Sequence, residues 1–243
     1  MSRIERLIFA KGVALESSVS SLKMIYSDGA EKYYQIPFFE DNNVIFALSD
    51  IYIDNDFNAA RQHFYNAASI ALHMSKKYDW RIMDNGTFQI SYALLSDNKA
   101  LIESYSTLKN KVNHETSLGF QLANAIQNIL LENWSSLDIN IRNVKRLTAV
   151  DKLRFFAPCA DVFESFRSKD PVKLEQALLT LIKDHPKRMK NGLTSEFMSS
   201  DTCAYCKLAW IKGYKIDLKT DLVPIKLMAV KPLENYETYD FLL

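Results

Sequence analysis

Glycine and proline are scarce in this sequence. Each occurs 6 times among 243 residues, well below the usual frequency of either residue in proteins. Folds rich in tight turns depend on both, because glycine supplies positive-φ conformations and proline fixes φ. Their scarcity favours long helices joined by short loops. With 48% hydrophobic residues the chain can bury a substantial core, so we predict an all-α fold, an array of antiparallel helical hairpins.

Glycine-rich loops and nucleophile motifs are also missing. The six glycines are isolated from one another, whereas a P-loop or a Rossmann nucleotide site needs them clustered. No Gly-x-Ser-x-Gly segment is present, so nothing marks a hydrolase nucleophile. We therefore predict no enzymatic activity, no cofactor and no small-molecule substrate.

The chain has almost no net charge. Thirty basic and 29 acidic side chains nearly cancel, so no overall field would draw the protein to nucleic acid or to an anionic membrane. Two basic clusters remain, and the acidic residues near them favour a solvated surface over a phosphate site. The clusters comprise Arg142, Lys145, Arg146, Lys152 and Arg154, and Lys183, Lys187, Arg188 and Lys190.

Long hydrophobic runs are absent too. No segment approaches the roughly 18 apolar residues of a membrane span, and residues 1–11 mix apolar side chains with charges, unlike a signal peptide. We predict a cytoplasmic protein without a membrane partner. Three cysteines, an odd number, suit a reducing compartment better than a disulfide framework.

Cys203 and Cys206 form a Cys-x-x-Cys pair, a spacing found in zinc and redox sites. Neither chemistry is supported, because Cys159 is the only other cysteine and no βαβ pattern surrounds the pair. The surrounding segment is apolar on nearly all sides, which predicts a buried helix whose cysteines act as small hydrophobic side chains. Gly213 is predicted to cap this helix and Trp210 to lie in the core.

The four histidines do not form a metal site. His63, His73, His114 and His185 lack the i, i+4 pairing and the nearby carboxylate of a helical zinc site. We expect surface or half-buried imidazoles and no bound metal.

Apolar residues recur at helical spacing in several segments. Between Asp56 and Tyr78 they recur every three or four residues, as in an amphipathic helix. The same pattern appears over residues 118–130, 153–163 and 174–182. Each stripe covers one face only, so each predicted helix requires neighbours.

Four aspartates stand at predicted helix starts, most clearly Asp170, which Pro171 follows. Asp56, Asp97, Asp138 and Asp170 are 41, 41 and 32 residues apart. Repeats of two helices have roughly 34 to 47 residues, so this spacing suggests stacked hairpins. A solenoid-like stack and an irregular helical array both stay open.

Two segments deviate from the helical pattern. Residues 33–39 are aromatic and β-prone and contain a proline, which predicts an extended connection over the core. Residues 44–53 fit a helix or a strand, and we predict a helix. No linker rich in glycine, serine or proline divides the chain, so residues 1–243 are predicted to form a single domain.

The C-terminal end is aromatic, with Tyr236, Tyr239 and Phe241 before a final pair of leucines. Most chains end in a polar, frayed segment. We therefore predict that the C-terminal segment docks on the body of the protein or on a partner.

An acidic and aromatic region precedes the first strongly amphipathic segment. A face that carries aromatic anchors and carboxylates suits a protein partner, above all a basic one. We predict an interface here, and the alternative that the aromatic residues simply belong to the core stays open. The predicted interface residues are Glu40, Asp41, Asp50, Tyr52, Asp54 and Asp56.

A further pattern extends over the last part of the chain. It consists of the run Cys206-Lys-Leu-Ala-Trp-Ile-Lys-Gly213, then Leu222-Val-Pro224, Leu227-Met228, Pro232-Leu233, Tyr236 and Tyr239-Asp-Phe-Leu. A helical pair precedes it, around Ser168-Lys-Asp-Pro171 and Ala177-Leu-Leu. Over roughly residues 90–243 the sequence resembles the immunity protein 49 family of bacterial polymorphic-toxin systems.

The resemblance implies a cytoplasmic antidote. Such a protein binds a cognate toxin domain and blocks it, which protects the producing cell and its kin in interbacterial competition. The partner would be that toxin domain, a protein. The resemblance does not identify the residues that touch the toxin, and we predict from the residues themselves that the acidic and aromatic region is the toxin interface.

Two other functions stay open. A helical-repeat adaptor or scaffold would bind a peptide or a nucleic acid in the groove of a superhelix. An enzyme with dispersed residues would bring His63, His114 or His185 to carboxylates in a cleft.

Overall fold

The computed structural model describes residues 1–27, 34–112, 115–189 and 192–243, and it confirms the all-α prediction for them. These residues form twelve α-helices and no strand. The α-helices are α1 (Arg3–Tyr26), α2 (Ile36–Ser49), α3 (Phe57–Tyr78), α4 (Phe88–Leu95), α5 (Lys99–Ser106), α6 (Leu118–Leu130), α7 (Trp134–Thr148), α8 (Pro158–Ser168), α9 (Pro171–Arg188), α10 (Gly192–Phe197), α11 (Ser200–Ile211) and α12 (Ile225–Met228). Short 3₁₀ or π-helical turns are η2 (Asp50–Asp54), η3 (Ile82–Asn85), η4 (Arg154–Phe156) and η5 (Asp240–Leu242).

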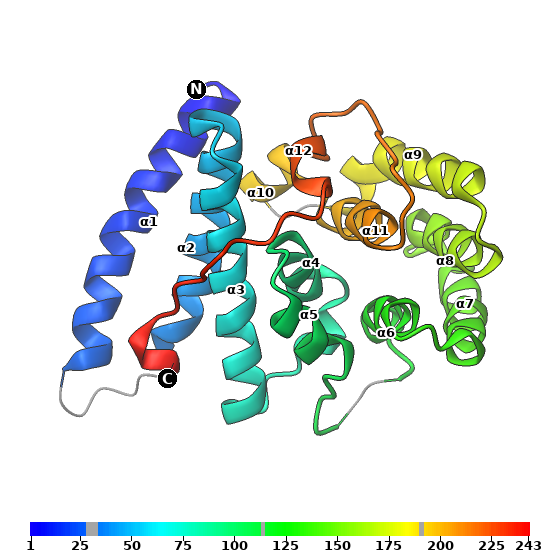
Figure 1. The fold of residues 1–243 in the computed structure, drawn as a ribbon, viewed down its shortest axis with the longest axis horizontal. Helices are drawn as coiled ribbons and strands as arrows, with labels where there is room; N and C mark the ends of the chain where they lie inside the picture. The colour runs from blue at the N-terminus through cyan, green and yellow to red at the C-terminus, as the bar shows by residue number, and fades with distance from the viewer. Residues whose placement is uncertain (28–33, 113–114, 190–191) are drawn as a thin grey trace.

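The helices form an irregular array (Figure 1). At one end α1, α2 and α3 pack in chain order, and at the other end α6, α7, α8 and α9 do the same. Between the two groups lies α11, which packs against α4, α6 and α9. The units of a solenoid contact only their neighbours in sequence, whereas α11 contacts α4, so the solenoid-like arrangement is not confirmed.

Two of the four aspartates predicted to start helices do so. Asp56 and Asp170 cap α3 and α9, and each accepts hydrogen bonds from two main-chain N–H groups of the first turn. The prediction is wrong for the other two, because Asn98 rather than Asp97 caps α5, and Asp138 lies inside α7. An asparagine oxygen caps a helix as well as a carboxylate does. The 41-residue spacing therefore does not mark a repeat of helix starts.

Three of the four amphipathic stripes predict a helix correctly. The helices predicted around residues 56–78, 118–130 and 174–182 are confirmed as α3, α6 and part of α9. The stripe over residues 153–163 is divided, because η4 precedes α8 and Pro158 begins the new helix. Proline has no N–H to continue a helix but is tolerated in a first turn.

The extended connection predicted over residues 33–39 is wrong in its described part. Helix α2 begins at Ile36, and Pro37 occupies its first turn, where a main-chain N–H has no intrahelical partner in any case. Tyr33 lies outside the described residues. The helix predicted over residues 44–53 is confirmed as the end of α2 and the π-helical turn η2.

Helix α11 confirms the buried helix predicted around the cysteine pair. Its residues 200–209 are all buried, and Cys203 and Cys206 are free thiols without exposed surface. Burial raises the pKa of Cys206 to about 12, so this thiol stays protonated. Both cysteines therefore serve as packing residues.

The cap predicted for this helix is also present. Gly213 has a φ of +90°, and its N–H donates to the carbonyl of Trp210, while the N–H of Tyr214 donates to the carbonyl of Ala209. These two bonds make a Schellman motif. Trp210 itself is half-buried: it packs against the main core, and its indole N–H donates to the carbonyl of Ile216 at 2.9 Å.

Three charged side chains meet inside the protein. Asp97 lies between Arg61 of α3 and Lys207 of α11, with distances of 2.9 Å from Oδ2 to Arg61 Nε and 2.6 Å from Oδ1 to Lys207 Nζ. All three residues are almost fully buried. Burial lowers the pKa of Lys207, and the attraction of Asp97 opposes that shift. This charged triad joins α3, α11 and the start of α5.

The triad also holds the C-terminal segment, residues 224–243. Arg61 donates to the main-chain oxygens of Lys226 and Ala229. Lys207 donates to those of Leu227 and Ala229. Hydrogen bonds from charged donors are stronger than neutral ones, so the segment is attached firmly where it begins.

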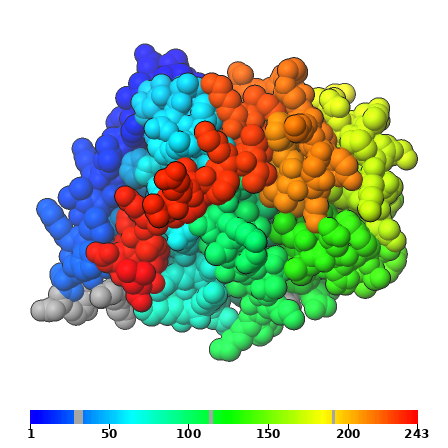
Figure 2. Space-filling model, in the orientation of Figure 1, coloured from blue at the N-terminus to red at the C-terminus, as the bar shows by residue number. Residues whose placement is uncertain are grey.

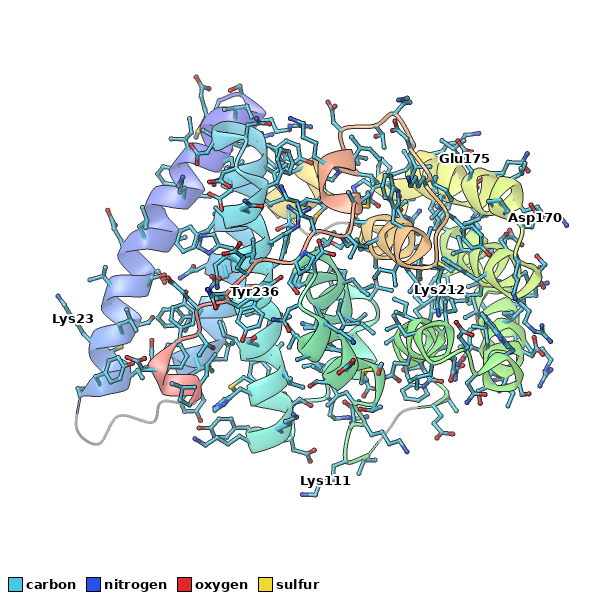
Figure 3. All side chains as sticks on the ribbon, viewed as in Figure 1. Lys23, Lys111, Asp170, Glu175, Lys212 and Tyr236 are labelled. Carbon is cyan, nitrogen blue, oxygen red and sulfur yellow. The ribbon has the colours of Figure 1, made fainter. Side chains whose placement is uncertain are left out.

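The rest of the C-terminal segment crosses α3 (Figures 1 and 2), which confirms the predicted docking. Tyr236 packs on Tyr65 with ring centroids 4.7 Å apart, and its hydroxyl donates to the carbonyl of Ser96 (Figure 3). Further along, Tyr239 packs edge-on against Phe39 at 5.3 Å. Tyr239 and Phe241 complete a small apolar cluster among α1, α2 and α3.

The main core is one connected cluster of buried apolar residues that extends from Leu7 in α1 to Met228 in α12. It joins the two ends of the helical array through α4 and α11. That residues 1–243 form a single domain stays a prediction.

We expect Asp97→Asn to destabilise the protein by about 3–5 kcal/mol, because it leaves two buried cations without a counter-charge. Urea unfolding followed by circular dichroism measures the loss. The matched control is Asp138→Asn, whose carboxylate pairs with Arg167 at the surface and should contribute at most about 1 kcal/mol. Equal stability of the two variants would contradict the role assigned to the triad.

Candidate functional site

The structure places the six predicted interface residues in different environments. Glu40 and Asp50 are buried and Tyr52 is half-buried. Asp41, Asp54 and Asp56 are exposed. The region is therefore not one continuous acidic face, and a partner can reach only part of it directly.

Several of these side chains hold helices together. Asp54 pairs with Lys11 of α1 at 2.8 Å. The Tyr52 hydroxyl lies 2.6 Å from the main-chain oxygens of Phe197 and Asp221, which come before and after α11. The region thus joins α1 and η2 to segments near α11, so changes in it affect the fold as well as any interface.

A cavity of about 630 Å³ lies between α2, α4 and α10, with Glu40 and Asp41 on its wall. Gln89 donates from Nε2 to Oε1 of Glu40 at 2.8 Å, while its own Oε1 is buried without a hydrogen-bonding partner in the described part of the chain. Burial is the main cause that raises the pKa of Glu40 to about 7; the hydrogen bond from Gln89 opposes this shift, and the charge of Asp41 adds to it. The cavity is rich in acceptors and suits a basic side chain.

His63 and His185 bond within the fold, and His185 is buried, which contradicts the predicted surface or half-buried imidazole. Nδ1 of His63 lies 2.9 Å from Oδ1 of Asn43, and Nε2 of His185 lies 2.7 Å from the carbonyl oxygen of Ser195. Burial lowers the pKa of His63 to about 4, so its ring is neutral near pH 7. Across the ranges that the structure describes, no three His, Cys, Asp or Glu side chains are placed to hold a metal ion. His114 lies outside those ranges.

The basic clusters include one buried residue. Arg188 makes two hydrogen bonds to the carboxylate of Asp201, at 3.0 and 3.1 Å, and both side chains are buried. It joins α9 to α11, so the predicted solvated surface is wrong for Arg188. At the surface Lys145 pairs with Glu164, and Lys190 lies outside the described residues.

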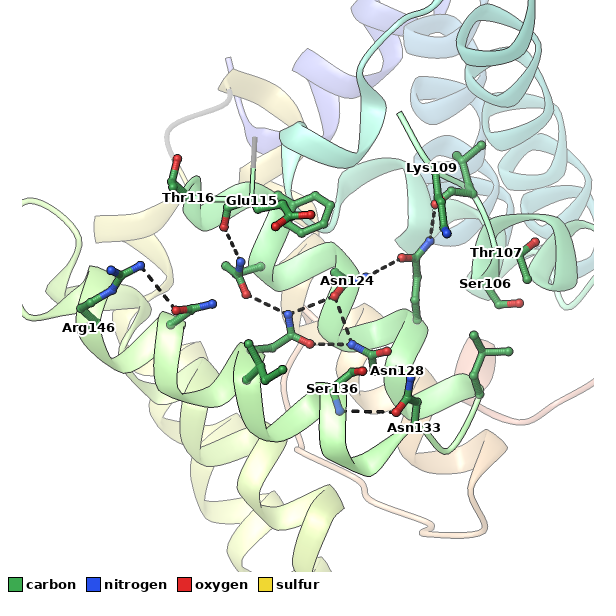
Figure 4. A pocket seen from close by; sticks show the side chains of 18 residues that line it. Ser106, Thr107, Lys109, Glu115, Thr116, Asn124, Asn128, Asn133, Ser136 and Arg146 are labelled. Atoms are coloured by element: carbon green, nitrogen blue, oxygen red, sulfur yellow. Dashed lines mark hydrogen bonds between the residues drawn. The ribbon is translucent and has the colours of Figure 1, made fainter. Parts of the chain in front are cut away.

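A larger cleft, of about 850 Å³, lies between α6 and α7 beside the end of α5 (Figure 4). Side-chain amides dominate its wall, and four of them belong to residues that are more than nine-tenths buried. We call it the amide cleft. Its amide residues are Gln121, Asn124, Gln127, Asn128, Asn133, Asn140 and Asn143.

Asn140 is the centre of a hydrogen-bonded network in the amide cleft. Its Nδ2 donates to Oε1 of Gln121 at 2.8 Å and to Oδ1 of Asn124 at 3.1 Å. Its Oδ1 accepts from Nδ2 of Asn128 at 2.7 Å. Gln127 extends the network by donating to two main-chain carbonyls at the end of α5. These bonds fix which end of each amide carries the oxygen.

None of the sequence predictions includes these amides. The available signal is a second, polar stripe, since Gln121, Asn124 and Asn128 share one face of α6, and Ser136 and Asn140 share one face of α7. Asparagine and glutamine are mostly exposed in proteins. The pattern alone therefore does not distinguish a cleft from an ordinary solvated surface.

A family model described as Immunity protein 49 matches residues 54–227. The chain belongs to the Immunity protein 49 family. This confirms the predicted resemblance, with different bounds, because the match begins before residue 90 and ends before the aromatic residues of the C-terminal segment. No curated protein and no solved structure gives a significant match.

The part of this Immunity protein 49 chain that matches its family contains the whole amide cleft and the charged triad. Of the six predicted interface residues only Asp54 and Asp56 fall within it. Helices α1 and α2 lie outside the match. Among the described helices, none combines the length and the hydropathy needed to span a membrane.

We expect Glu40→Gln to change how stability depends on pH. Because the pKa is raised from 4.5 to about 7 in the folded state, the stability that protonated Glu40 contributes is present below pH 4.5 and lost as pH rises through 7. The variant keeps a neutral side chain at this position. At about pH 8 its free energy of unfolding should therefore exceed that of the native protein by about 1–3 kcal/mol. The two should be nearly equal at about pH 4.5.

Urea titrations at both pH values measure this difference. Asp54→Asn, at the exposed pair with Lys11, is the control for losing one carboxylate. A stability difference for Glu40→Gln that does not vary with pH would show that burial does not govern this carboxyl.

Proposed function

We propose that this protein neutralises a cognate bacterial toxin by binding it directly. The observation that carries the proposal is membership of the Immunity protein 49 family, with a match over residues 54–227. An immunity protein protects a cell from a toxin, and a toxin domain is therefore the expected partner. Direct binding is our inference about how protection is achieved.

The chemistry of the amide cleft supports recognition rather than catalysis. Side-chain amides do not titrate and cannot act as general acids or bases near neutral pH, whereas they donate and accept hydrogen bonds at fixed positions. We infer that the protein blocks its toxin by occupying it, without a reaction or a cofactor of its own. A cytoplasmic site of action stays a prediction from the sequence.

Co-expression tests the proposal. Cells that express the toxin domain encoded by the neighbouring reading frame should survive when this protein is produced with it. The purified pair should form a stoichiometric complex with a Kd on the order of nanomolar or tighter, as interfaces of standard size allow. Viable counts and isothermal titration calorimetry with a catalytically inactivated toxin domain measure both effects.

A toxin domain of the same activity from an unrelated system is the control and should be neither bound nor neutralised. Absence of rescue together with absence of binding would refute the proposal. Rescue without a complex would refute the direct mechanism alone.

We also propose that the acidic region provides a toxin contact, limited to the groups that a partner can reach. These are the exposed carboxylates of Asp41 and Asp54 and the cavity that contains Glu40. Asp50 is buried, Tyr52 donates to main-chain oxygens and Asp56 caps α3, so replacing these three would test stability instead. Asp54 pairs with Lys11 at the surface, where an ion pair contributes at most about 1 kcal/mol. A basic side chain of the toxin would satisfy the excess of acceptors in the cavity.

Asp41→Lys combined with Asp54→Lys should weaken toxin binding about 10-fold at low ionic strength and less at high ionic strength, because exposed charges act over a distance that salt screens. Surface plasmon resonance over a salt series measures this. Asp151→Lys with Glu175→Lys makes the same charge change elsewhere, at exposed positions, and should have little effect. Equal effects of the two pairs would remove the acidic region from the interface.

A further inference from the structure

We infer that the amide cleft binds an extended main-chain segment of the toxin domain, held by hydrogen bonds between side-chain amides and peptide groups. The inference rests on the proposed function, because it names the surface that the partner occupies. It does not depend on the acidic region.

The first argument is that the amides are not needed to close the core. Helices α6 and α7 already bury apolar stripes, which include Leu122 and Ile126 in α6 and Leu137 and Ile141 in α7. Burying an amide costs free energy unless it is hydrogen-bonded, and an apolar residue at Asn140 would avoid that requirement. A cleft lined by buried amides is therefore built for polar recognition.

The second argument is the hydrogen-bonding capacity that stays free. A primary amide offers two N–H groups and one oxygen. Asn124 donates one N–H to Gln127, and Asn128 donates both of its N–H groups, to Asn124 and Asn140. From the described residues, Oδ1 of Asn128 accepts no hydrogen bond and the second N–H of Asn124 finds no acceptor. Asn124 and Asn128 thus leave one donor and one acceptor between them at the wall.

Their spacing fits a peptide main chain. Asn124 and Asn128 are one helical turn apart on α6 and lie side by side in the cleft (Figure 4). Their amides are hydrogen-bonded to each other, with Asn128 Nδ2 3.1 Å from Asn124 Oδ1, so the free donor and the free acceptor belong to two amides in contact. A residue of an extended segment presents its N–H and its C=O on the same side and can exchange both hydrogen bonds with one partner site.

The charge of the cleft also favours a neutral main chain. The amide network contains no ionisable group, and charged side chains in the cleft lining are Lys109, Glu115 and Arg146. Arg146 donates to Oδ1 of Asn143. Tight binding of a nucleic acid depends on many cations along a phosphate backbone, which this lining does not provide. A peptide segment needs no such counter-charge.

Apolar side chains flank the amides and can receive the side chains of the bound segment. Leu131 and Ile139 line the cleft and are 53% and 50% exposed. Leu131 directly follows α6 and Ile139 belongs to α7, so they lie on either side of the turn that joins the two helices. Polar groups that fix a main chain beside exposed apolar contacts are a usual composition for a peptide-binding groove.

Filling the cleft tests the inference. Ser136 lines it and Ser135, the preceding residue on α7, is exposed and does not. Ser136→Trp should weaken binding of the inactivated toxin domain about 30-fold or more, the effect of losing a hot spot. Ser135→Trp, with the same bulk one position away, should bind like the native protein. Ser136→Ala should also bind normally, since the hydroxyl is not required.

Titration calorimetry measures the affinities, and thermal unfolding by circular dichroism checks that the two tryptophan variants are equally folded. Hydrogen–deuterium exchange on the native complex gives a second measurement, in which residues 118–148 should become protected when the toxin domain binds. Because amides do not titrate, the contribution of the cleft should not change between about pH 6 and pH 8.

Three results would overturn the inference. If the native protein binds and Ser136→Trp binds equally well, the toxin sits elsewhere and the proposed function stands. If both tryptophan variants weaken binding equally, the effect is not specific to the cleft. If a fluorescent single-stranded RNA binds the native protein and Ser136→Trp alone prevents it while toxin binding is unchanged, the cleft serves nucleic acid. Absence of native toxin binding would remove the proposed function and the inference together.

Discussion

Asp97 neutralises two buried cations, and the packing of the middle of the protein depends on it. Arg61 belongs to α3 and Lys207 to α11, so both helices must approach the start of α5 closely enough for ion pairs of 2.9 and 2.6 Å. A buried cation without a counter-charge is strongly destabilising. The same cations bind main-chain oxygens of the C-terminal segment, so the triad also fixes where that segment begins.

A second buried pair applies the same constraint on the other side of α11. Arg188 of α9 and Asp201 of α11 are joined by two hydrogen bonds. Buried ion pairs therefore join α11 to α3 at one end of the array and to α9 at the other. This explains why the array is irregular, because a helix held between two groups interrupts the neighbour-to-neighbour stacking of a solenoid.

Helices held together in this way can present a binding surface that loses little conformational entropy when a partner binds. The amides of the cleft are already ordered by their bonds to Asn140, so little conformational freedom is left to lose when a partner binds. The cleft and the triad both lie in the part of the chain that the Immunity protein 49 family shares. A fixed polar cleft on a fixed helical body fits a protein whose proposed action is to occupy another.

Much of the fold could be predicted, and the candidate site could not. The stripes of α3, α6 and α9, the cap at Asp56 and the all-round apolar character of α11 are local patterns, so they can be read from short segments. Asp97 resembles a helix cap by the same local criteria, yet its carboxylate binds two distant cations. The burial of Glu40 could not be predicted for the same reason, because it depends on residues that are distant in the sequence.

The sequence by itself determined the all-α class, the apolar faces of α3, α6 and α9 and the burial of α11, because backbone preference and periodicity act within a few residues. Only the tertiary structure decided which polar residues meet. Asn128 and Asn140 form one wall of a cleft, while Glu40 and Asp50 are buried and Asp97 lies between two cations. These outcomes depend on how separate helices pack. Packing is decided by many weak contacts between residues far apart in the sequence, so no short segment determines it.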